Sequence, residues 1–440
     1  DLPILEVIND AVGNQPTKRR DFLKYMGFSI SAAALAASCE MPVRKAIPYV
    51  IKPEEVIPGV ANYYASTFAD GGQYCPVLVK TREGRPIKVE GNPNSPITEG
   101  GTSARVQASV LSLYDNNRIK NPRKREGKEW QQVSWRSLDM EVMSQLRAAD
   151  SAGKKIVMVS STVMSPSTRQ LFDDFGSRYT NFEHVSYDPV SYSAMLEANE
   201  QSFGQRNLPS YDFGSADVIV SVAADFLGTW LNPIENARGY IRHRKIDRNN
   251  PSMSRHIQIE SNMSMTGANA DTRIPLRPSQ LKHALVALYN EITRGSQSGV
   301  DQKVASHPKI KEAARELMQA NGRSLVVCGL NDVDAQIITN AINSRLNNIG
   351  TTVNPGTPAY YKEGNDRELV RVMNEMKAGR VGVVMFYNCN PCYDFPDYEE
   401  FTAAVNGVPL SVAFVRHASF NDRSIAGQLN QRWLNYRDEL

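Results

Sequence analysis

Residues 74–93 decide how the rest of the chain is interpreted; they read Tyr-Cys-Pro-Val-Leu-Val-Lys-Thr-Arg-Glu-Gly-Arg-Pro-Ile-Lys-Val-Glu-Gly-Asn-Pro. Apolar or β-branched side chains alternate with charged ones on both sides of a central turn. That turn contains Gly84, a residue that adopts positive φ at little steric cost. Alternation around a glycine turn predicts a β-hairpin. By itself the pattern predicts a surface hairpin without chemistry.

The segments that follow this hairpin add a family resemblance. Gly100-Gly101, Ala104-Arg105 and Leu113-Tyr114-Asp115 come next. In this order the pieces resemble the N-terminal segment of the molybdopterin oxidoreductase superfamily. In most members of that family, this segment holds a [4Fe–4S] cluster on four cysteines. Three of them lie near the start of the hairpin, and the fourth lies between the Gly-Gly and the Ala-Arg.

The cluster ligands implied by this resemblance are missing. In the first group only Cys75 remains, because residues 70–73 carry no thiol, and Ser103 stands where the fourth cysteine is expected. A cubane cluster needs thiolate at all or nearly all of its irons. We therefore expect no iron–sulfur cluster and no metal ligand in this segment.

Composition places the chain among ordinary globular proteins and excludes several function classes. Its 440 residues allow two or three domains. The net charge of +3, without a long basic run, gives little support to nucleic-acid binding. Five scattered cysteines are too few for a disulfide scaffold. The resemblance implies a longer protein, so we treat the chain as a partial polypeptide.

The first residues resemble an export signal. Thr17–Lys24 contains Arg19-Arg20 followed by Asp-Phe-Leu-Lys, the pattern of a twin-arginine leader, and the apolar run after it is too short to span a membrane. The alternative is an amphipathic helix with a chance arginine pair. Cys39 lies in a lipobox-like context and is otherwise a plain small residue. We expect a retained leader over residues 1–38 and a proline-rich extended strap over residues 39–68.

From residue 154 onward, short apolar runs alternate with helical patterns. Strands are predicted at 156–159, 218–222, 256–260, 324–328, 382–387 and 409–413, and helices at 136–148, 165–178, 281–293, 308–320 and 332–347. This alternation predicts parallel sheets covered on both faces. We expect an α/β, molybdopterin-oxidoreductase-like fold in which an N-terminal β-rich segment (69–150) precedes doubly wound α/β domains at 151–300 and 301–440.

Loops that in the family contact the pterin dinucleotide are present but altered. Ala223 stands in place of a glycine after one strand, and Tyr387-Asn388 replaces a small residue in a Gly-x-Asn-Pro-like turn. By contrast, Thr266–Asp271 and Arg277 match the segment that in relatives lies near the guanosine end of the cofactor. Glycine loss keeps a backbone from approaching a pyrophosphate closely. We expect no cofactor-binding residue.

The remaining cysteines, histidines and serines do not indicate a catalytic or metal site. Cys389 and Cys392 form a CxxC without a second CxxC or a histidine pair at metal spacing, so a structural role is favoured over a redox pair. The six histidines are dispersed, and no nucleophile elbow or phosphate-binding loop occurs. Ser160 and Ser161 are ordinary strand-end residues. We therefore name no catalytic residue.

Within the superfamily, the chain most resembles the cofactor-free, molybdopterin-oxidoreductase-like part of the iron–sulfur subunit of bacterial alternative complex III. That resemblance implies a non-catalytic scaffold in a membrane-bound quinol oxidoreductase at the periplasmic face. Its implied partners are quinol-binding integral membrane subunits, a multihaem cytochrome c, a ferredoxin-like iron–sulfur domain and a terminal oxidase. Iron–sulfur clusters and haem c are then expected in those parts.

Two other functions stay open. One is an exported oxidoreductase that uses molybdopterin guanine dinucleotide, favoured by the intact Thr266–Asp271 segment and Arg277. The other is a lipid-anchored binding protein outside electron transfer, which rests on Cys39 alone. Metal and pterin content would distinguish the enzyme from the scaffold.

Overall fold

The computed structural model describes residues 56–70, 73–116, 118–127, 129–246, 248, 251–296, 298–415 and 427–430. The chain divides into two compact units, Asp1–Val56 and Ile57–Leu440. All the elements below belong to the second unit. The leader, Cys39 and most of the expected strap lie outside the described residues.

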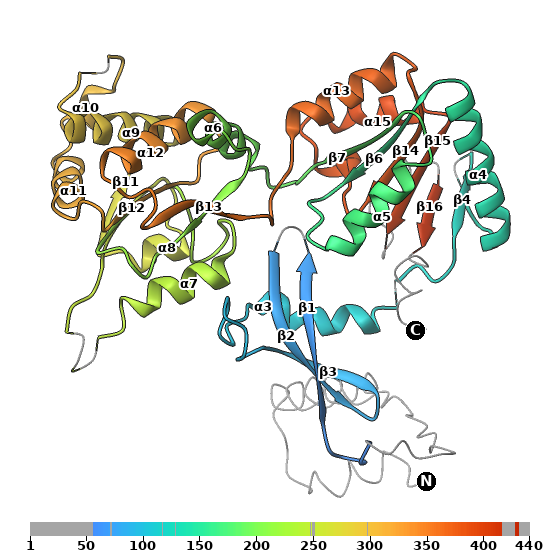
Figure 1. Cartoon of the computed structure of the whole chain (residues 1–440), viewed down its shortest axis with the longest axis horizontal. Coiled ribbons are helices and arrows are strands. Elements are labelled where there is room, and N and C mark those ends of the chain that lie inside the picture. Colours follow the sequence, from blue (N-terminus) through green and yellow to red (C-terminus); the bar gives the residue numbers. More distant parts are fainter. Residues whose placement is uncertain are drawn as a thin grey trace, which may run out of the picture. The chain divides into compact units, whose positions relative to one another are not determined.

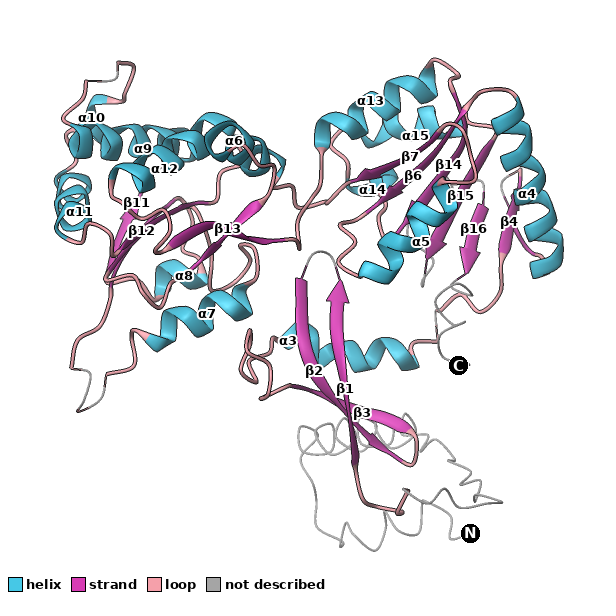
Figure 2. Ribbon diagram, in the orientation of Figure 1, coloured by secondary structure: helices cyan, strands magenta, loops and turns pink. Residues whose placement is uncertain are grey.

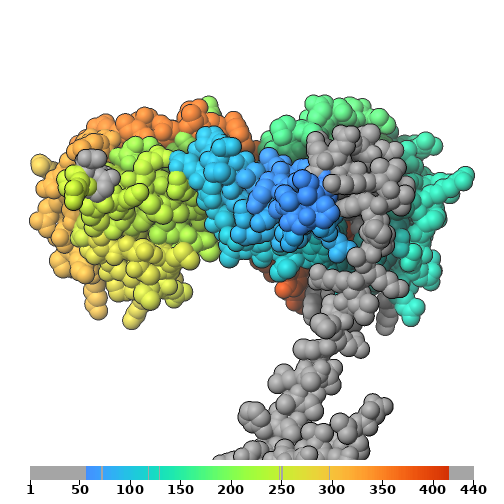
Figure 3. Space-filling view, turned by 90° about the horizontal axis from the view of Figure 1, so that it is seen from below, coloured from blue at the N-terminus to red at the C-terminus, as the bar shows by residue number. Residues whose placement is uncertain are grey.

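The N-terminal sheet has three antiparallel strands, in the order β1 (Asn62–Asp70), β2 (Gln73–Arg82) and β3 (Arg85–Gly91). Strands β2 and β3 form the predicted hairpin. Both central residues of its turn, Glu83 and Gly84, have positive φ, at 52° and 76°, as tight hairpin turns require. Most of β1 is exposed to solvent, and its surface is blue in Figure 3.

The segment after this hairpin packs closely against it. A Cβ at Gly91 would lie 2.2 Å from the Gly100 carbonyl oxygen, so only glycine fits there. The chain then forms helix α3 (Ala104–Ala108) and the 3-10 helix η1 (Ser109–Tyr114). Ser103 caps α3 by accepting a hydrogen bond from the Val106 amide.

The largest sheet has seven strands, in the order β5–β4–β16–β15–β14–β6–β7. Neighbours from β16 to β7 are parallel, whereas β5, β4 and β16 pair antiparallel. Its strands are β4 (Arg123–Glu126), β5 (Glu129–Gln132), β6 (Lys155–Ser160), β7 (Phe182–Ser186), β14 (Val381–Tyr387), β15 (Leu410–Val415) and β16 (Gly427–Asn430). The associated helices are α4 (Trp135–Ser151), α5 (Pro166–Gly176), α13 (Asp366–Lys377), α14 (Pro391–Asp394) and α15 (Tyr398–Asn406), as Figure 1 shows.

A second sheet of four parallel strands has the order β11–β10–β9–β12. Its strands are β9 (Val218–Val222), β10 (Arg255–Glu260), β11 (Thr272–Pro275) and β12 (Ser324–Cys328). The helices of this region are α6 (Ser193–Phe203), α7 (Pro233–Arg242), α8 (Met265–Ala268), α9 (Pro278–Thr293), α10 (Gln302–Ala305), α11 (Pro308–Gln319) and α12 (Val333–Arg345). Strands β8 (Leu208–Tyr211) and β13 (Val353–Ala359) form a separate antiparallel pair.

Alternating side chains on each central strand enter different cores, so both sheets are covered on both faces. On β9, Val220 joins the core formed with α9, α11 and α12, whereas Ile219 joins the core formed with α6 and α7. On β6, Val159 packs with α13 and α15, and Met158 packs with α4 and α5. Helices flank the sheets in Figure 2. The predicted doubly wound α/β fold is thereby confirmed.

The sheets cut across the expected domain boundaries after residues 68, 150 and 300, the second of them because β4 pairs with β16. Strand β12 lies beyond residue 300 yet pairs with β9, and β14 pairs with β6 rather than with β12. The 301–440 segment therefore contributes strands to both large sheets. In addition, β1 begins at Asn62, so residues 62–68 form a paired strand rather than a strap. An apolar run in the sequence predicts a strand but not the strand with which it pairs, because parallel neighbours are joined by long crossover connections.

Candidate functional site

The structure brings the surviving cysteine beside the serine segment that follows the hairpin. Cys75 is fully buried, and its thiol donates to the Gly101 carbonyl at 3.4 Å. The Gln73 side-chain amide donates to the Ser103 hydroxyl at 3.4 Å. Strand β2 and the Gly-Gly segment are thus held together by hydrogen bonds and a small apolar core that includes Ile234 of α7.

The loops after β9 and β10 are tied together by one carboxylate. Asp225 follows β9, and its Oδ1 accepts from the Thr266 hydroxyl at 2.7 Å and from the Thr266 amide at 3.0 Å. The Thr266 hydroxyl oxygen in turn accepts from the Leu227 amide at 2.9 Å. In α/β folds, ligands bind at the carboxyl ends of neighbouring parallel strands. The loops after β9 and β10 are therefore a candidate ligand site.

Further along the second loop, acidic groups pair with arginines. Asp271 accepts two hydrogen bonds from Arg244, both at 2.9 Å, and a third from the His256 amide. Glu260, at the end of β10, accepts from Arg273 and from Ser264. The intact Thr266–Asp271 segment is therefore engaged in the packing of its own loop.

The turn after β14 contains the CxxC. Cys389 donates to the Val159 carbonyl at 3.4 Å, Cys392 is 1% exposed, and neither forms a disulfide. Burial raises the pKa of the Cys389 thiol well above its usual range and raises the pKa of nearby Asp394 to about 6. A thiol with a raised pKa is a poor nucleophile, which favours the structural interpretation.

Sequence reasoning missed a buried polar network at the carboxyl ends of β6 and β7. Asp188, 2% exposed, accepts from the Thr162 hydroxyl at 2.6 Å, the Thr162 amide at 3.0 Å and the Gly364 amide at 3.2 Å. Next to it, Lys362 is 5% exposed and lies over the ring of Tyr192 at 5.6 Å. Burial lowers the pKa of Lys362. Strand β7 was not among the predicted strands, so no predicted strand end drew attention to Asp188.

Comparison with known proteins places this arrangement in a family. A model of the molybdopterin oxidoreductases matches residues 118–414, more than half of the chain. The chain belongs to the molybdopterin oxidoreductase family. The match begins after the Cys75 and Ser103 segment and includes the loops after β6, β7, β9, β10 and β14.

Two curated family relatives are similar over much of the chain. The menaquinone reductase molybdopterin-binding-like subunit of Nitratidesulfovibrio vulgaris is 23% identical over 411 residues, covering 80% of this chain and 56% of that protein. The arsenate respiratory reductase molybdopterin-containing subunit ArrA of Shewanella sp. (strain ANA-3) is 22% identical over 266 residues, covering 58% of this chain and 29% of that protein. The chain thus spans about half or less of the length of these relatives.

A solved structure supports the same fold. Acetylene hydratase from Pelobacter acetylenicus matches with a TM-score of 0.59 and 11% sequence identity, covering 81% of this chain and 61% of that protein. At this identity the likeness concerns the fold alone. It agrees with the mixed α/β architecture and its parallel sheets.

The residues at the hairpin corner do not fit a [4Fe–4S] cluster. They offer one thiol and one serine hydroxyl, and burial raises the pKa of the Cys75 thiol, which disfavours the thiolate that iron requires. Among the described residues, no group of three or more histidine, cysteine, aspartate or glutamate side chains is arranged to hold a metal ion.

The loop after β9 does not fit a pyrophosphate either. The amides of Gly228, Thr229 and Trp230 all donate to the Asp225 carbonyl, so these groups are already paired. A cavity of about 10 Å³ lies beyond the end of β12 and is lined by Trp230, Cys328 and Leu330, among others. Ligand pockets are typically about 300–1,000 Å³, so this cavity is too small for a dinucleotide.

The backbone has a glycine-like conformation at two positions where the family resemblance implies a glycine or another small residue. Ala223 and Asn388 have φ of 56° and 54°, in the left-handed region that non-glycine residues rarely adopt. In addition, the Ala223 carbonyl oxygen would lie 2.2 Å from a Cβ at Gly329. At Ala223 and Asn388 the backbone therefore has the shape expected of glycine, although both residues carry a side chain.

The left-handed backbone conformation of Ala223 predicts that substitution by glycine has different effects on stability at Ala223 and at the adjacent Ala224. Ala223→Gly should leave the free energy of unfolding unchanged or raise it by up to about 1 kcal/mol, because relief of the left-handed conformation offsets the entropy cost of glycine. Ala224, fully buried and without positive φ, is the matched control, and Ala224→Gly should lower it by about 1 kcal/mol or more. Urea unfolding measures both. A larger loss for Ala223→Gly than for Ala224→Gly would contradict the geometry.

A buried histidine predicts acid sensitivity. His256 is fully buried, with Nδ1 at 3.1 Å from the Tyr240 hydroxyl, and burial lowers its pKa from 6.5 to about 4. The unfolded chain takes up this proton first, so the group's contribution is complete above pH 6.5 and is lost as the pH falls toward 4. The loss should reach about 3 kcal/mol. His256→Phe should flatten the pH dependence of urea unfolding between these values, and an unchanged dependence would contradict this assignment.

Proposed function

We propose that the chain is a non-catalytic, cofactor-free scaffold part of a membrane-bound quinol oxidoreductase complex. The observation that carries the proposal is the loop after β9, where the amides of Gly228, Thr229 and Trp230 all donate to the Asp225 carbonyl and a nearby cavity measures only about 10 Å³. A family member that bound its dinucleotide there would need an open cleft and free amide donors. This chain keeps the fold and uses the loops for its own packing.

The quinone link comes from the curated relative. That protein is named as the molybdopterin-binding-like subunit of a menaquinone reductase and matches 80% of this chain. By analogy, we propose a quinone-linked electron-transfer assembly, and specifically one like alternative complex III. Electrons from quinol would then pass through clusters and haems on neighbouring parts, while this chain holds those parts in place.

The proposed partners are quinol-binding integral membrane subunits, a multihaem cytochrome c and a ferredoxin-like iron–sulfur domain, with a terminal oxidase as a further partner. Arg19-Arg20 and the apolar run that follows support export to the periplasmic face of the membrane. Across the part of the chain that the structure describes, no helix has the length and apolarity needed to cross a bilayer.

The second candidate is an enzyme that binds molybdopterin guanine dinucleotide. Arg277 favours it, because this residue is exposed at the N-cap of α9 and could face a ligand. Against it stand the carboxylates of the same region, since Asp271 is paired with Arg244 and Glu260 with Arg273. The scaffold therefore remains the better-supported function.

The experiment that tests the scaffold function removes the last cysteine of the hairpin segment. Cys75→Ser in the full complex, purified from detergent-solubilised membranes, should leave iron, haem and quinol:cytochrome c reductase activity within about twofold, since a lone thiol cannot hold a cluster. Cys328→Ser is the matched control because that thiol is equally buried. A loss of iron with Cys75→Ser but not with Cys328→Ser would overturn the proposal.

A further inference from the structure

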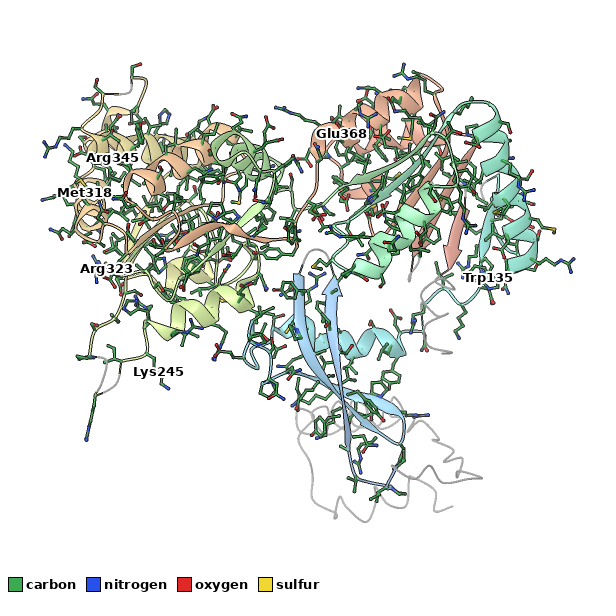
Figure 4. The ribbon with its side chains drawn as sticks, viewed as in Figure 1. Trp135, Lys245, Met318, Arg323, Arg345 and Glu368 are labelled. Carbon is green, nitrogen blue, oxygen red and sulfur yellow. The ribbon has the colours of Figure 1, made fainter. Side chains whose placement is uncertain are left out.

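The three-stranded sheet ends in a strand whose outer edge is open. The strand order β1–β2–β3 puts β2 on one side of β1 and no other described strand on its other side. All nine residues of β1 pair with β2 without a shift of register. Figure 4 draws the side chains of this sheet on its pale blue ribbon. The edge of a sheet presents unpaired backbone groups that can pair with another chain.

Every second residue of β1 forms this open edge. The Asn92 amide donates to the Pro76 carbonyl at 3.1 Å, so the even-numbered residues of β2 hydrogen-bond to β3. Because the N–H and C=O groups alternate in direction along a strand, the odd-numbered residues of β2 hydrogen-bond to β1. Their partners are the even-numbered residues of β1. The backbone groups that point away from the sheet therefore belong to Tyr63, Ala65, Thr67 and Ala69.

The sequence of β1 does not protect this edge. Natural edge strands are blunted by lysine, by proline, by a bulge or by a very short length. Strand β1 is nine residues long and reads Asn-Tyr-Tyr-Ala-Ser-Thr-Phe-Ala-Asp. Its only charged side chain, Asp70, pairs with Arg105, and residues 63–67 are all exposed. The strand thus offers a further strand an edge about 30 Å long.

The face of this sheet that points away from its core carries an excess of positive charge. Lys80 of β2 lies opposite Tyr63, and Lys88 of β3 lies opposite Lys80. Like charges at directly opposed positions destabilise a sheet. Lys88 pairs with Glu90 at 2.7 Å, whereas Lys80 forms no ion pair with any described residue. The Lys80 Nζ lies 5.6 Å from the centre of the Tyr63 ring, so this ammonium group is beside an edge residue.

The charge on this face distinguishes between the possible occupants of the edge. Directly paired residues lie on the same face of a sheet. A second copy of β1 would therefore bring its own odd-numbered residues to the face of Lys80, and none of these carries a carboxylate. A partner strand with Asp or Glu opposite Tyr63 would instead place a carboxylate beside Lys80. The positive charge thus favours an acidic segment over a second copy.

We propose that the outer edge of β1 binds an extended, acidic segment of a partner protein, which adds a fourth strand to this sheet. In this mode of recognition, main-chain hydrogen bonds give affinity and alternate side chains give specificity. The segment carries Asp or Glu opposite Tyr63, where the carboxylate pairs with Lys80, and small or β-branched residues opposite Ala65 and Thr67. The inference concerns the hairpin sheet alone, so it holds for a scaffold and for a cofactor-binding enzyme alike.

Binding of a synthetic strand to the full chain tests this surface. The probe is a fluorescein-labelled peptide as long as β1, made of alternating Thr and Val with one Glu near its C-terminal end, which meets Tyr63 in an antiparallel pair. A second probe has Lys in place of Glu. Fluorescence anisotropy should show at least about tenfold tighter binding of the acidic probe, and Lys80→Glu should reverse the preference. Equal affinities for the two probes, or no binding of either, would overturn the proposal.

A proline in β1 separates strand pairing from attraction by charge alone. Ala65→Pro removes an amide that points to solvent and does not bond to β2, so the fold should tolerate it, whereas affinity for the acidic probe should fall at least about tenfold. Thr67→Pro removes the next outward amide and should act in the same way. Ala65→Ser keeps the amide and is the matched control, expected to bind within about twofold of the wild type. Unchanged affinity in both proline variants would contradict strand addition.

Photo-crosslinking identifies the occupant in the assembled protein. With p-benzoylphenylalanine at position 65 of the complex purified from membranes, mass spectrometry should find links to one partner segment that contains Asp or Glu. The same probe at Ser112 of η1, which contacts the other edge strand, β3, should not give these links. Links only to a second copy, only to a segment without an acidic residue, or none at all would contradict the proposal. The peptide assay needs the chain alone, so its result does not depend on the proposed function.

Discussion

Asp188→Ala is expected to lower the free energy of unfolding by about 3–5 kcal/mol, the largest effect of any single polar substitution that we predict. The Asp188 carboxylate is almost fully buried and accepts three hydrogen bonds, two from Thr162 and one from Gly364. Alanine would leave all three donors without an acceptor in a place that water does not reach. It would also remove a negative charge that raises the pKa of buried Lys362 and so opposes the effect of burial.

Two further variants separate this effect from a general loss of charge. Asp188→Asn keeps the shape and one acceptor oxygen but turns an NH₂ group toward the remaining donors, so an intermediate loss of about 1–3 kcal/mol is expected. Asp174→Ala, at an exposed position on α5, should change the free energy of unfolding by no more than about 0.5 kcal/mol. Urea unfolding at pH 7 measures all three. A loss below about 1 kcal/mol for Asp188→Ala would show that the network contributes little.

Phe226→Ala is expected to cost about 3–5 kcal/mol, as for other fully buried aromatic residues. Phe226 lies in the loop after β9 and has no exposed surface; its ring centroid is 4.4 Å from Phe213, 5.2 Å from His256 and 5.4 Å from Tyr240. Truncation would open a cavity among these rings. The loop after β9 would thereby lose the side chain that fixes its position.

The control for Phe226 is an aromatic residue of similar size at the surface. Tyr393, 64% exposed, should tolerate alanine with a change of no more than about 0.5 kcal/mol, whereas Phe226→Leu should show a smaller loss than Phe226→Ala. Thermal and urea unfolding give the comparison. If Phe226→Ala were as mild as Tyr393→Ala, the loop would be loosely packed, and the argument that it is a structural rather than a binding loop would fail.

Local patterns in the sequence predicted the hairpin, the central strands of both large sheets and several of the longer helices. The hairpin around Gly84 and the buried runs that became β6, β9, β12 and β14 follow from alternation and length, because both signals depend on near neighbours in sequence. The family fold was also predicted, and the comparisons confirm it. These features depend on residues that lie close together along the chain.

Long-range contacts were not predictable in the same way. Asp225 and Thr266 are 41 residues apart, and Asp188 and Gly364 are 176 apart, yet each pair shares a hydrogen bond. In each pair, the sequence around one residue does not indicate its hydrogen-bond partner, since the crossover connections decide which strand ends meet. The same limit explains why the boundary at residue 300 was misplaced and why β1 was assigned to a strap.

The measurement that tests the central claim most directly is the molybdenum, tungsten and pterin content of the purified full chain. Mass-spectrometric metal analysis and the fluorescence of oxidised pterin should both give no more than trace amounts per polypeptide, because the amides of the loop after β9 are paired within the chain and the cavity beside it measures only about 10 Å³. One molybdenum or tungsten atom per chain, together with pterin, would contradict the account and identify the protein as a cofactor-binding enzyme of its family.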